Sequence, residues 1–219
     1  MRLMLCNGSS RGKRSNTAIL LKHFADGFMA TQGNSYELAY LMRLKEHPDF
    51  AKKLRQADAA IIAFPLYTDS MPAIVKDFIE TLGAGKGKMP ALGFIIQSGY
   101  PETIHSRFVE KYCEKLARRL NAKYLGTVIR GGIEGIQFKH PLLTQRIFMA
   151  FRSLGRHFGV TKEFHPIIKM KLAGREQMST IGRIMFRIFQ ITGLSNFHWN
   201  KVLKQHGAYE HRFDRPYQP

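Results

Sequence analysis

The sequence predicts an α/β fold, in which helices cover both faces of one five-stranded parallel sheet. Three observations support this. Short apolar segments of strand length alternate five times with segments whose apolar residues recur at helical spacing. Residues 58–64 are apolar almost without interruption, as in a central parallel strand buried on both faces. Polar loops follow the first, third and fourth strands, at the sheet edge where such folds bind ligands.

Each expected strand has its own signal. Residues 2–6 and 91–96 are compact apolar runs, each followed directly by a polar loop. Residues 36–41 alternate apolar and polar side chains after a Gly-Asn turn, and residues 122–130 end at a Gly-Gly pair. With right-handed crossovers and a polar loop after the first strand, these strands suit the flavodoxin-like order 2-1-3-4-5.

The expected helices lie between these strands. They span residues 15–30, 50–56, 73–82, 103–121 and 142–157. The first is preceded by possible capping residues, and the third follows Pro72, which suits a first helical turn. The fourth carries large side chains at helical spacing, namely Phe108, Tyr112, Leu116 and Leu120. Residues 83–88 are rich in glycine and lysine, follow a helix, and are expected to form a solvated connection.

The loop at residues 7–17 combines the features of an anion site. It leads from the first strand into the first helix, where backbone N–H groups are free and the helix dipole is positive. Its hydroxyls, the Asn16 amide and three basic side chains add donors, and two glycines permit close approach of a ligand. We expect it to bind phosphate, although Ser15 or Asn16 could simply cap the helix.

Two halves of this loop carry a family resemblance. The run Gly-Ser-Ser-Arg at 8–11, followed by Ser-Asn-Thr at 15–17, resembles the phosphate loop of NADPH-dependent FMN reductases and related quinone reductases of flavodoxin-like fold. Many members have proline where Ser10 stands, and the spacing between the halves varies. Residues 65–76 and 97–100 resemble the segments that lie against the isoalloxazine ring and hold its polar edge. The resemblance covers roughly residues 1–160.

The resemblance implies a function and a set of site residues. An NAD(P)H-dependent oxidoreductase would pass hydride from NADPH or NADH through FMN to a quinone, a nitro or azo compound, or free flavin. FMN carries this chemistry, so no catalytic side chain and no metal is expected. The implied cofactor-binding residues are Ser9, Ser10, Arg11, Ser15, Asn16, Thr17, Pro65, Leu66, Tyr67, Thr68, Gln97, Ser98, Gly99 and Tyr100. Two alternatives stay open, a flavodoxin-like electron carrier and a phosphate- or membrane-binding module without flavin.

Composition narrows the choice of partner and compartment. The 219 residues carry 34 Lys and Arg against 16 Asp and Glu, a net charge of +18, so anionic partners are favoured. No nucleic-acid recognition module is recognisable. The two cysteines, Cys6 and Cys113, lie in apolar patterns without Cys-x-x-Cys spacing and are expected to be buried thiols. The chain enters its first strand without a signal-like segment, and we expect a cytoplasmic protein.

The pattern changes after residue 160. We expect a flavodoxin-like FMN-binding domain at 1–160 and a basic helical extension at 161–219. Residues 178–192 carry apolar side chains at helical spacing, with Arg183 and Arg187 on another face. Such a helix could lie on an anionic membrane, but packing on the domain or on a second subunit of a homodimer is favoured.

Overall fold

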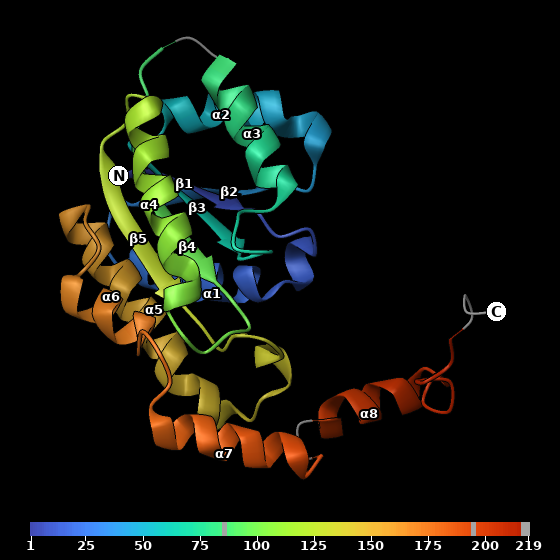
Figure 1. Ribbon diagram of the computed structural model, residues 1–219. Coiled ribbons are helices and arrows are strands. Elements are labelled where there is room, and N and C mark those ends of the chain that lie inside the picture. The colour runs from blue at the N-terminus through green and yellow to red at the C-terminus, as the bar shows by residue number, and fades with distance from the viewer. Residues whose placement is uncertain (85–86, 194–195, 216–219) are drawn as a thin grey trace. The chain divides into compact units, whose positions relative to one another are not determined.

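The computed structural model describes residues 1–84, 87–193 and 196–215 (Figure 1). The chain divides into two compact units, Met1–Gln177 and Met178–Pro219, and each is treated by itself. The first unit therefore continues past the predicted boundary at residue 160.

A parallel sheet of five strands lies at the centre of the first unit (Figure 1). Its strands are β1 (Arg2–Asn7), β2 (Ser35–Tyr40), β3 (Ala59–Pro65), β4 (Ala91–Gln97) and β5 (Tyr124–Arg130). The order is β2-β1-β3-β4-β5, which confirms the flavodoxin-like topology predicted from the sequence. In register, Leu5 of β1 lies opposite Leu38 of β2 and Ile61 of β3. The strand ends agree with the expected ends to within two residues.

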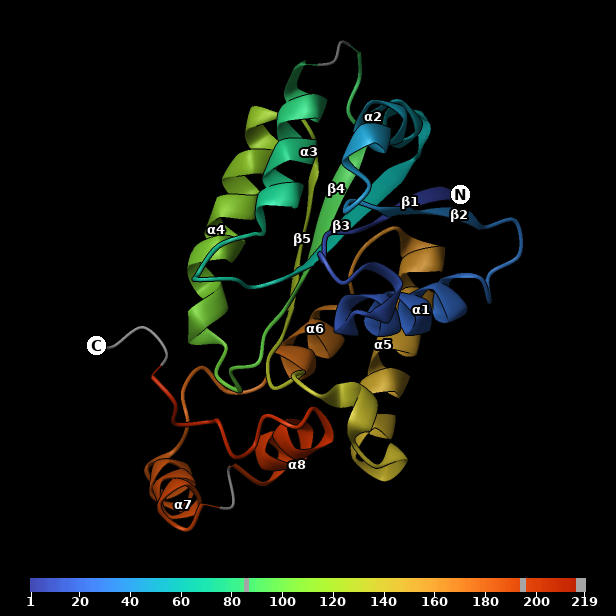
Figure 2. The same cartoon turned by 90° about the vertical axis from the view of Figure 1, so that its right-hand side faces the viewer.

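Helices cover both faces of the sheet. They are α1 (Asn16–Phe28), α2 (His47–Gln56), α3 (Ala73–Ala84), α4 (Ile104–Arg119), α5 (Pro141–Thr161) and α6 (Pro166–Ala173). Helices α2, α3 and α4 share one apolar core with the sheet, and α1, α5 and α6 share the other. Figure 2 shows α3 and α4 on one side of the sheet and α1 and α5 on the opposite side.

The two cores arise from the period-two alternation of buried strands. In β1, Met4 and Cys6 face the α2–α4 core, whereas Leu3 and Leu5 face the α1–α5 core. Strand β3 is buried along its whole length, so its apolar sequence follows from having helices on both sides.

The buried side of α4 differs from the expected apolar stripe. Phe108 is 73% exposed and Tyr112 is 48% exposed. The side of α4 that meets the core instead carries Val109, Cys113, Leu116 and Ala117. The prediction was based on large side chains at helical spacing, two of them aromatic. In the structure, smaller side chains of α4 pack against the sheet.

The described residues of the second unit form two helices, α7 (Thr180–Ile191) and α8 (Phe197–Gln205). A basic helical segment after the domain was predicted, and α7 lies close to the expected bounds. Ser179 caps α7, because its hydroxyl accepts from the Gly182 N–H at 3.2 Å. Among the described residues, no helix has the length and apolarity needed to span a bilayer.

Candidate functional site

The loop after β1 is organised by one amide. Asn7, the last residue of β1, is fully buried. Its Nδ2 donates to the Gly12 carbonyl at 3.3 Å and to Ser15 Oγ at 3.2 Å. Its Oδ1 accepts from the Ser9 N–H at 3.0 Å. One side chain thus holds both halves of the loop in a tight curl at the start of α1.

Ser15 completes this curl as the N-cap of α1. Its hydroxyl accepts from the Ala18 N–H at 3.1 Å and donates to the Gly12 carbonyl at 2.6 Å. The hydroxyl hydrogen is therefore used within the loop. Ser15 shapes the loop and leaves other groups to contact a ligand, in line with the capping role that the sequence left open for it.

Several donors of the loop keep free capacity. The backbone N–H groups of Ser10, Asn16 and Thr17 donate to no group within the described parts of the chain. These N–H groups lie in the loop and in the first turn of α1, where the helix dipole favours negative charge. Ser10 and Arg11 are exposed beside them, and the Asn16 Oδ1 is buried without a partner. The free N–H groups suit an anion, and the Asn16 Oδ1 suits a hydrogen-bond donor attached to that anion.

Gly8 lets the loop lie directly on the sheet. A Cβ at this position would approach Val75 Cγ2 to 2.3 Å and Phe64 Cβ to 3.1 Å. The Gly8 N–H also donates to the Ala63 carbonyl at 2.7 Å, which joins the loop to β3. Any side chain here would push the first loop away from β3 and from the start of α3.

The loop after β3 contains a strained turn. Tyr67 and Ser70 exchange two backbone hydrogen bonds of 2.9 and 3.0 Å. Between them, Thr68 and Asp69 have φ values of 47° and 57°. Positive φ at both central residues is the pattern of a type I′ turn, which favours Asn and Gly rather than Thr and Asp. Strain of this kind gathers at ligand clamps and other functional segments.

The loop after β4 is joined to the loop after β5. The Ser98 N–H donates to the Arg130 carbonyl at 3.1 Å, and the Ser98 carbonyl accepts from the Ile133 N–H at 2.9 Å. A Cβ on Gly131 would lie 2.3 Å from the Tyr100 carbonyl oxygen, so the two backbones need glycine there. The Tyr100 ring, 59% exposed, lies 4.6 Å from the ring of His105.

Hydrogen bonds between these loops bring them together at one sheet edge. Gln97 Nε2 donates to Thr17 Oγ1 at 3.4 Å, which links the end of β4 to the start of α1. The Leu66 N–H donates to the Gln97 carbonyl at 2.8 Å, which links the second loop to the third. Asn16 Nδ2 donates to the Ile133 carbonyl at 3.2 Å.

The predicted site residues thus fall into buried and open groups. The buried members, which hold the loops together, are Ser9, Ser15, Asn16, Thr17, Pro65, Gln97 and Ser98. The exposed members, which are open to a ligand, are Ser10, Arg11, Tyr67, Thr68, Gly99 and Tyr100, and Leu66 is half-buried.

Sequence reasoning missed two contributors. Asn7 was placed in the loop without a role, although its position at a strand end before a Gly-Ser turn was a usable signal. The Ile133 segment after β5 had no local signal, because it joins the site through backbone contacts with Asn16 and Ser98.

Nearby, burial lowers the pKa of Arg130, whose Nη1 donates to the Leu172 carbonyl at 3.3 Å.

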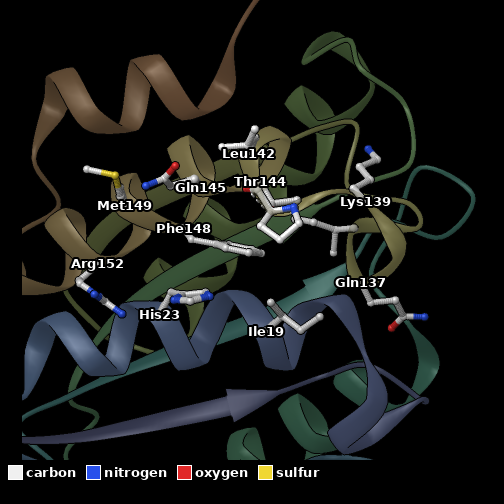
Figure 3. Close-up of a pocket in the computed structure, with 12 residues that line it drawn as sticks. Ile19, His23, Gln137, Lys139, Leu142, Thr144, Gln145, Phe148, Met149 and Arg152 are labelled. Carbon is white, nitrogen blue, oxygen red and sulfur yellow. Dashed lines mark hydrogen bonds between the residues drawn. The ribbon is translucent and has the colours of Figure 1, made fainter.

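A cavity of about 740 Å³ lies beside these loops, between α1, α5 and the segment that precedes α5 (Figure 3). Its walls are mostly apolar, and the His23 ring stacks on Phe148 with centroids 4.1 Å apart. His23 Nδ1 is buried without a partner, and desolvation lowers the pKa of the ring. The sequence did not predict this cavity, because its walls come from segments more than a hundred residues apart.

Comparison with known proteins supports the family resemblance. Residues 1–95 match the family described as NADPH-dependent FMN reductase. This match confirms the resemblance inferred from the first loop over the residues that it covers. No curated protein sequence matches the chain.

Solved structures share the fold at low identity. An NAD(P)H:quinone oxidoreductase from Methanothermobacter marburgensis aligns with TM-score 0.60 and 15% identity, over 75% of this chain and 98% of that chain. An FMN-dependent NADH-azoreductase from Bacillus anthracis, solved with FMN, aligns with TM-score 0.56 and 13% identity, over 72% and 99%. An NADPH-quinone reductase from P. pentosaceus aligns with TM-score 0.53 and 18% identity, over 69% and 96%. Between a quarter and a third of this chain lies outside each alignment.

Proposed function

We propose that this protein is an FMN-dependent NAD(P)H oxidoreductase that reduces a small acceptor. The observation that carries the proposal is the loop after β1, whose free backbone donors stand at the start of a helix. The family match over residues 1–95 contains this loop and the loop after β3, which supports FMN as the anion. The acceptor class, a quinone, a nitro or azo compound or free flavin, is part of the proposal.

The loop after β1 has the donors that an FMN phosphate requires. The free N–H groups of Ser10, Asn16 and Thr17 would donate to phosphate oxygens, with the Ser10 hydroxyl and Arg11 beside them. The unpartnered Asn16 Oδ1 would accept from a hydroxyl of the ribityl chain, which would satisfy an otherwise costly buried acceptor. The donor set and the cofactor are therefore matched in charge and in polarity.

The other two loops would hold the isoalloxazine ring. Leu66 and the exposed rings of Tyr67 and Tyr100 offer apolar and aromatic surface for a flat ligand. The Gly99 N–H makes no hydrogen bond within the described residues and could serve the polar edge of the ring. Pro65, Thr68, Gln97 and Ser98 would keep these segments in place.

Bound FMN supplies the hydride chemistry between NAD(P)H and the acceptor. The protein's own residues would orient the ring, exclude water from one side of it and favour negative charge on it. The exposed Arg11, Lys13 and Arg14 would also attract the phosphates of a nicotinamide dinucleotide. No side chain of this chain is assigned a proton-transfer role.

Titration of the apoprotein with FMN and with riboflavin tests the phosphate site. FMN should bind far more tightly than riboflavin, which lacks the phosphate. Ser10→Ala should weaken FMN about tenfold and leave riboflavin unchanged, because a hydrogen bond to a charged group contributes ~1.5 kcal/mol or more. Ser35→Ala, at the opposite end of the sheet, is the matched control and should change neither. Equal affinities for FMN and riboflavin would refute the phosphate assignment.

Anaerobic addition of NADPH and then NADH to the FMN-loaded protein tests the activity. Rapid loss of flavin absorbance, reversed by a quinone or an azo dye, is expected. If FMN binds but is reduced only when a partner reductase is added, the protein is an electron carrier. If FMN does not bind, a phosphate- or membrane-binding module without flavin remains as the interpretation.

We also propose a homodimer in the cytoplasm. Exposed apolar side chains in the first half of α5, Leu142, Leu143 and Met149, give a surface that a second subunit could cover. Cys6 and Cys113 are buried free thiols, which suits a reducing compartment. Sedimentation equilibrium of the wild type and of Leu143→Glu would test the dimer, and a monomeric wild type would contradict it.

A further inference from the structure

The amphipathic helix α7 has an apolar side that is open to solvent. Four apolar residues recur at the i, i+3, i+4, i+7 spacing of one helical face, Ile181, Ile184, Met185 and Ile188. Their side chains are 75%, 54%, 60% and 49% exposed, respectively. No residue of α7 is buried. A helix of this kind gains nothing from its apolar face unless that face meets another surface.

The charged residues of α7 are all basic. Arg183 and Arg187 are four residues apart, on the side opposite the apolar face, and neither forms an ion pair within the described residues. Residues 177–209 contain four Arg and Lys and no Asp or Glu. The surface that covers α7 should therefore be apolar where it meets the isoleucine side of the helix and negatively charged where it meets the arginines.

We propose that α7 docks on an anionic phospholipid surface and lies in the plane of the membrane interface. Its twelve residues extend only about 18 Å as a helix, less than the ~30 Å hydrocarbon thickness of a bilayer. It is therefore too short to span a bilayer, but it can bury its apolar side among the acyl chains near the headgroups. Arg183 and Arg187 then reach back to lipid phosphates.

Charge favours lipid over a second copy of the chain. A second copy of residues 177–209 would offer no carboxylate to the arginines of α7, because that segment has none. The whole chain repeats the imbalance, with a net charge of +18. An anionic headgroup layer supplies the missing negative charge over a continuous surface. This inference concerns α7 alone and does not depend on flavin binding or on reductase activity.

Cosedimentation of the full-length protein with vesicles tests the proposal. Binding is expected with mixed phosphatidylcholine and phosphatidylglycerol vesicles, with strong weakening in high salt, and not with phosphatidylcholine alone. Arg183→Gln with Arg187→Gln should weaken binding about thirtyfold, from ~1 kcal/mol per basic residue. Ile184→Glu with Ile188→Glu should abolish detectable binding. Phe108→Glu, which alters an exposed apolar residue on α4, is the matched control and should bind as the wild type does.

A fluorescent reporter identifies α7 as the contact. The chain has one tryptophan, at Trp199, so Trp199→Phe removes the background and Phe189→Trp places a single indole on α7. Its emission should shift to the blue on anionic vesicles and be quenched by brominated acyl chains. An unshifted emission at lipid concentrations that sediment the protein would overturn the proposal.

Three other outcomes would contradict the docking of α7 on anionic lipid, in whole or in part. Equal binding by the wild type and both α7 double variants would overturn the role of α7. Equal binding to neutral and anionic vesicles would overturn the electrostatic part. A dimer that dissociates when Ile184 and Ile188 become Glu, in a protein that does not bind vesicles, would show a second copy to be the occupant. The arginine variant keeps the apolar face unchanged, so it stays informative if the glutamate variant folds poorly.

Discussion

Replacement of Gly155 by alanine should destabilise the fold, although helix propensity predicts the opposite. Gly155 lies in α5 where this helix crosses α1, and a Cβ there would stand 1.9 Å from the Phe24 carbonyl oxygen. The contact is reciprocal, because a Cβ on Gly27 of α1 would stand 1.8 Å from the Arg152 carbonyl oxygen. Backbone atoms cannot rotate away from the added methyl group as a side chain could. The two helices must therefore move apart to make room for it.

The magnitude follows from two opposing terms. Overpacking costs about 3 kcal/mol at the upper end of its usual range. Alanine returns about 1 kcal/mol of helix propensity over glycine. The net loss of about 2 kcal/mol should lower the midpoint of thermal unfolding by roughly 4–8 °C for a chain of this size. Because α1 begins at the loop after β1, FMN affinity should fall as well.

Thermal unfolding followed by far-ultraviolet circular dichroism measures this effect, with Gly83→Ala as the control. Gly83 is also helical, but a Cβ there would meet only Leu120 Cδ2, at 4.0 Å. Gly83→Ala should therefore leave stability unchanged or raise it by up to ~1 kcal/mol. If Gly155→Ala is as stable as Gly83→Ala, the close packing of α1 on α5 is wrong.

Three further predictions follow from local features. Thr68→Asn with Asp69→Gly should stabilise the fold by about 1 kcal/mol in urea unfolding, because these residues suit positive φ; an unchanged midpoint would show that the turn is unstrained. Burial raises the pKa of Cys6 to about 12 and raises that of Cys113 as well, so neither native thiol should react with Ellman's reagent, and fast labelling would contradict their burial. Burial lowers the pKa of His23, so the folded state binds its proton less readily than the unfolded state. Stability should fall as the pH drops below ~6.5, and urea midpoints of His23→Phe should show less of this loss.

Much of the fold was predictable because its signals are local. The apolar runs of β1, β3 and β4 follow from burial on both faces, and the alternation of strands with helices fixes the class. The buried side of α4 was not predictable by this route. Phe108 and Tyr112 have helical spacing as clear as that of Val109 and Cys113, and only packing against the sheet chooses between them.

The polar composition of the loop after β1 was predictable, but the hydrogen bonds made by its individual atoms were not. The run of Ser, Gly, Asn and Thr at 8–17 led us to predict an anion site. It could not show that the Ser15 hydroxyl caps α1 while the Ser10 N–H stays free. That difference depends on Asn7, whose hydrogen bonds to Ser9, Gly12 and Ser15 fix the conformation of the loop.

Residue patterns along the chain were enough to predict the class of fold, the position of the polar loop after β1 and the basic amphipathic character of α7, because each depends on neighbouring residues. The contacts of Gln97 with Thr17 and of Ile133 with Asn16, and the cavity between α1 and α5, could be found only in three dimensions. The physical reason is that hydrogen bonds and packing between distant segments depend on the path of the chain through the sheet. The spacing of residues along the chain does not show which distant segments meet.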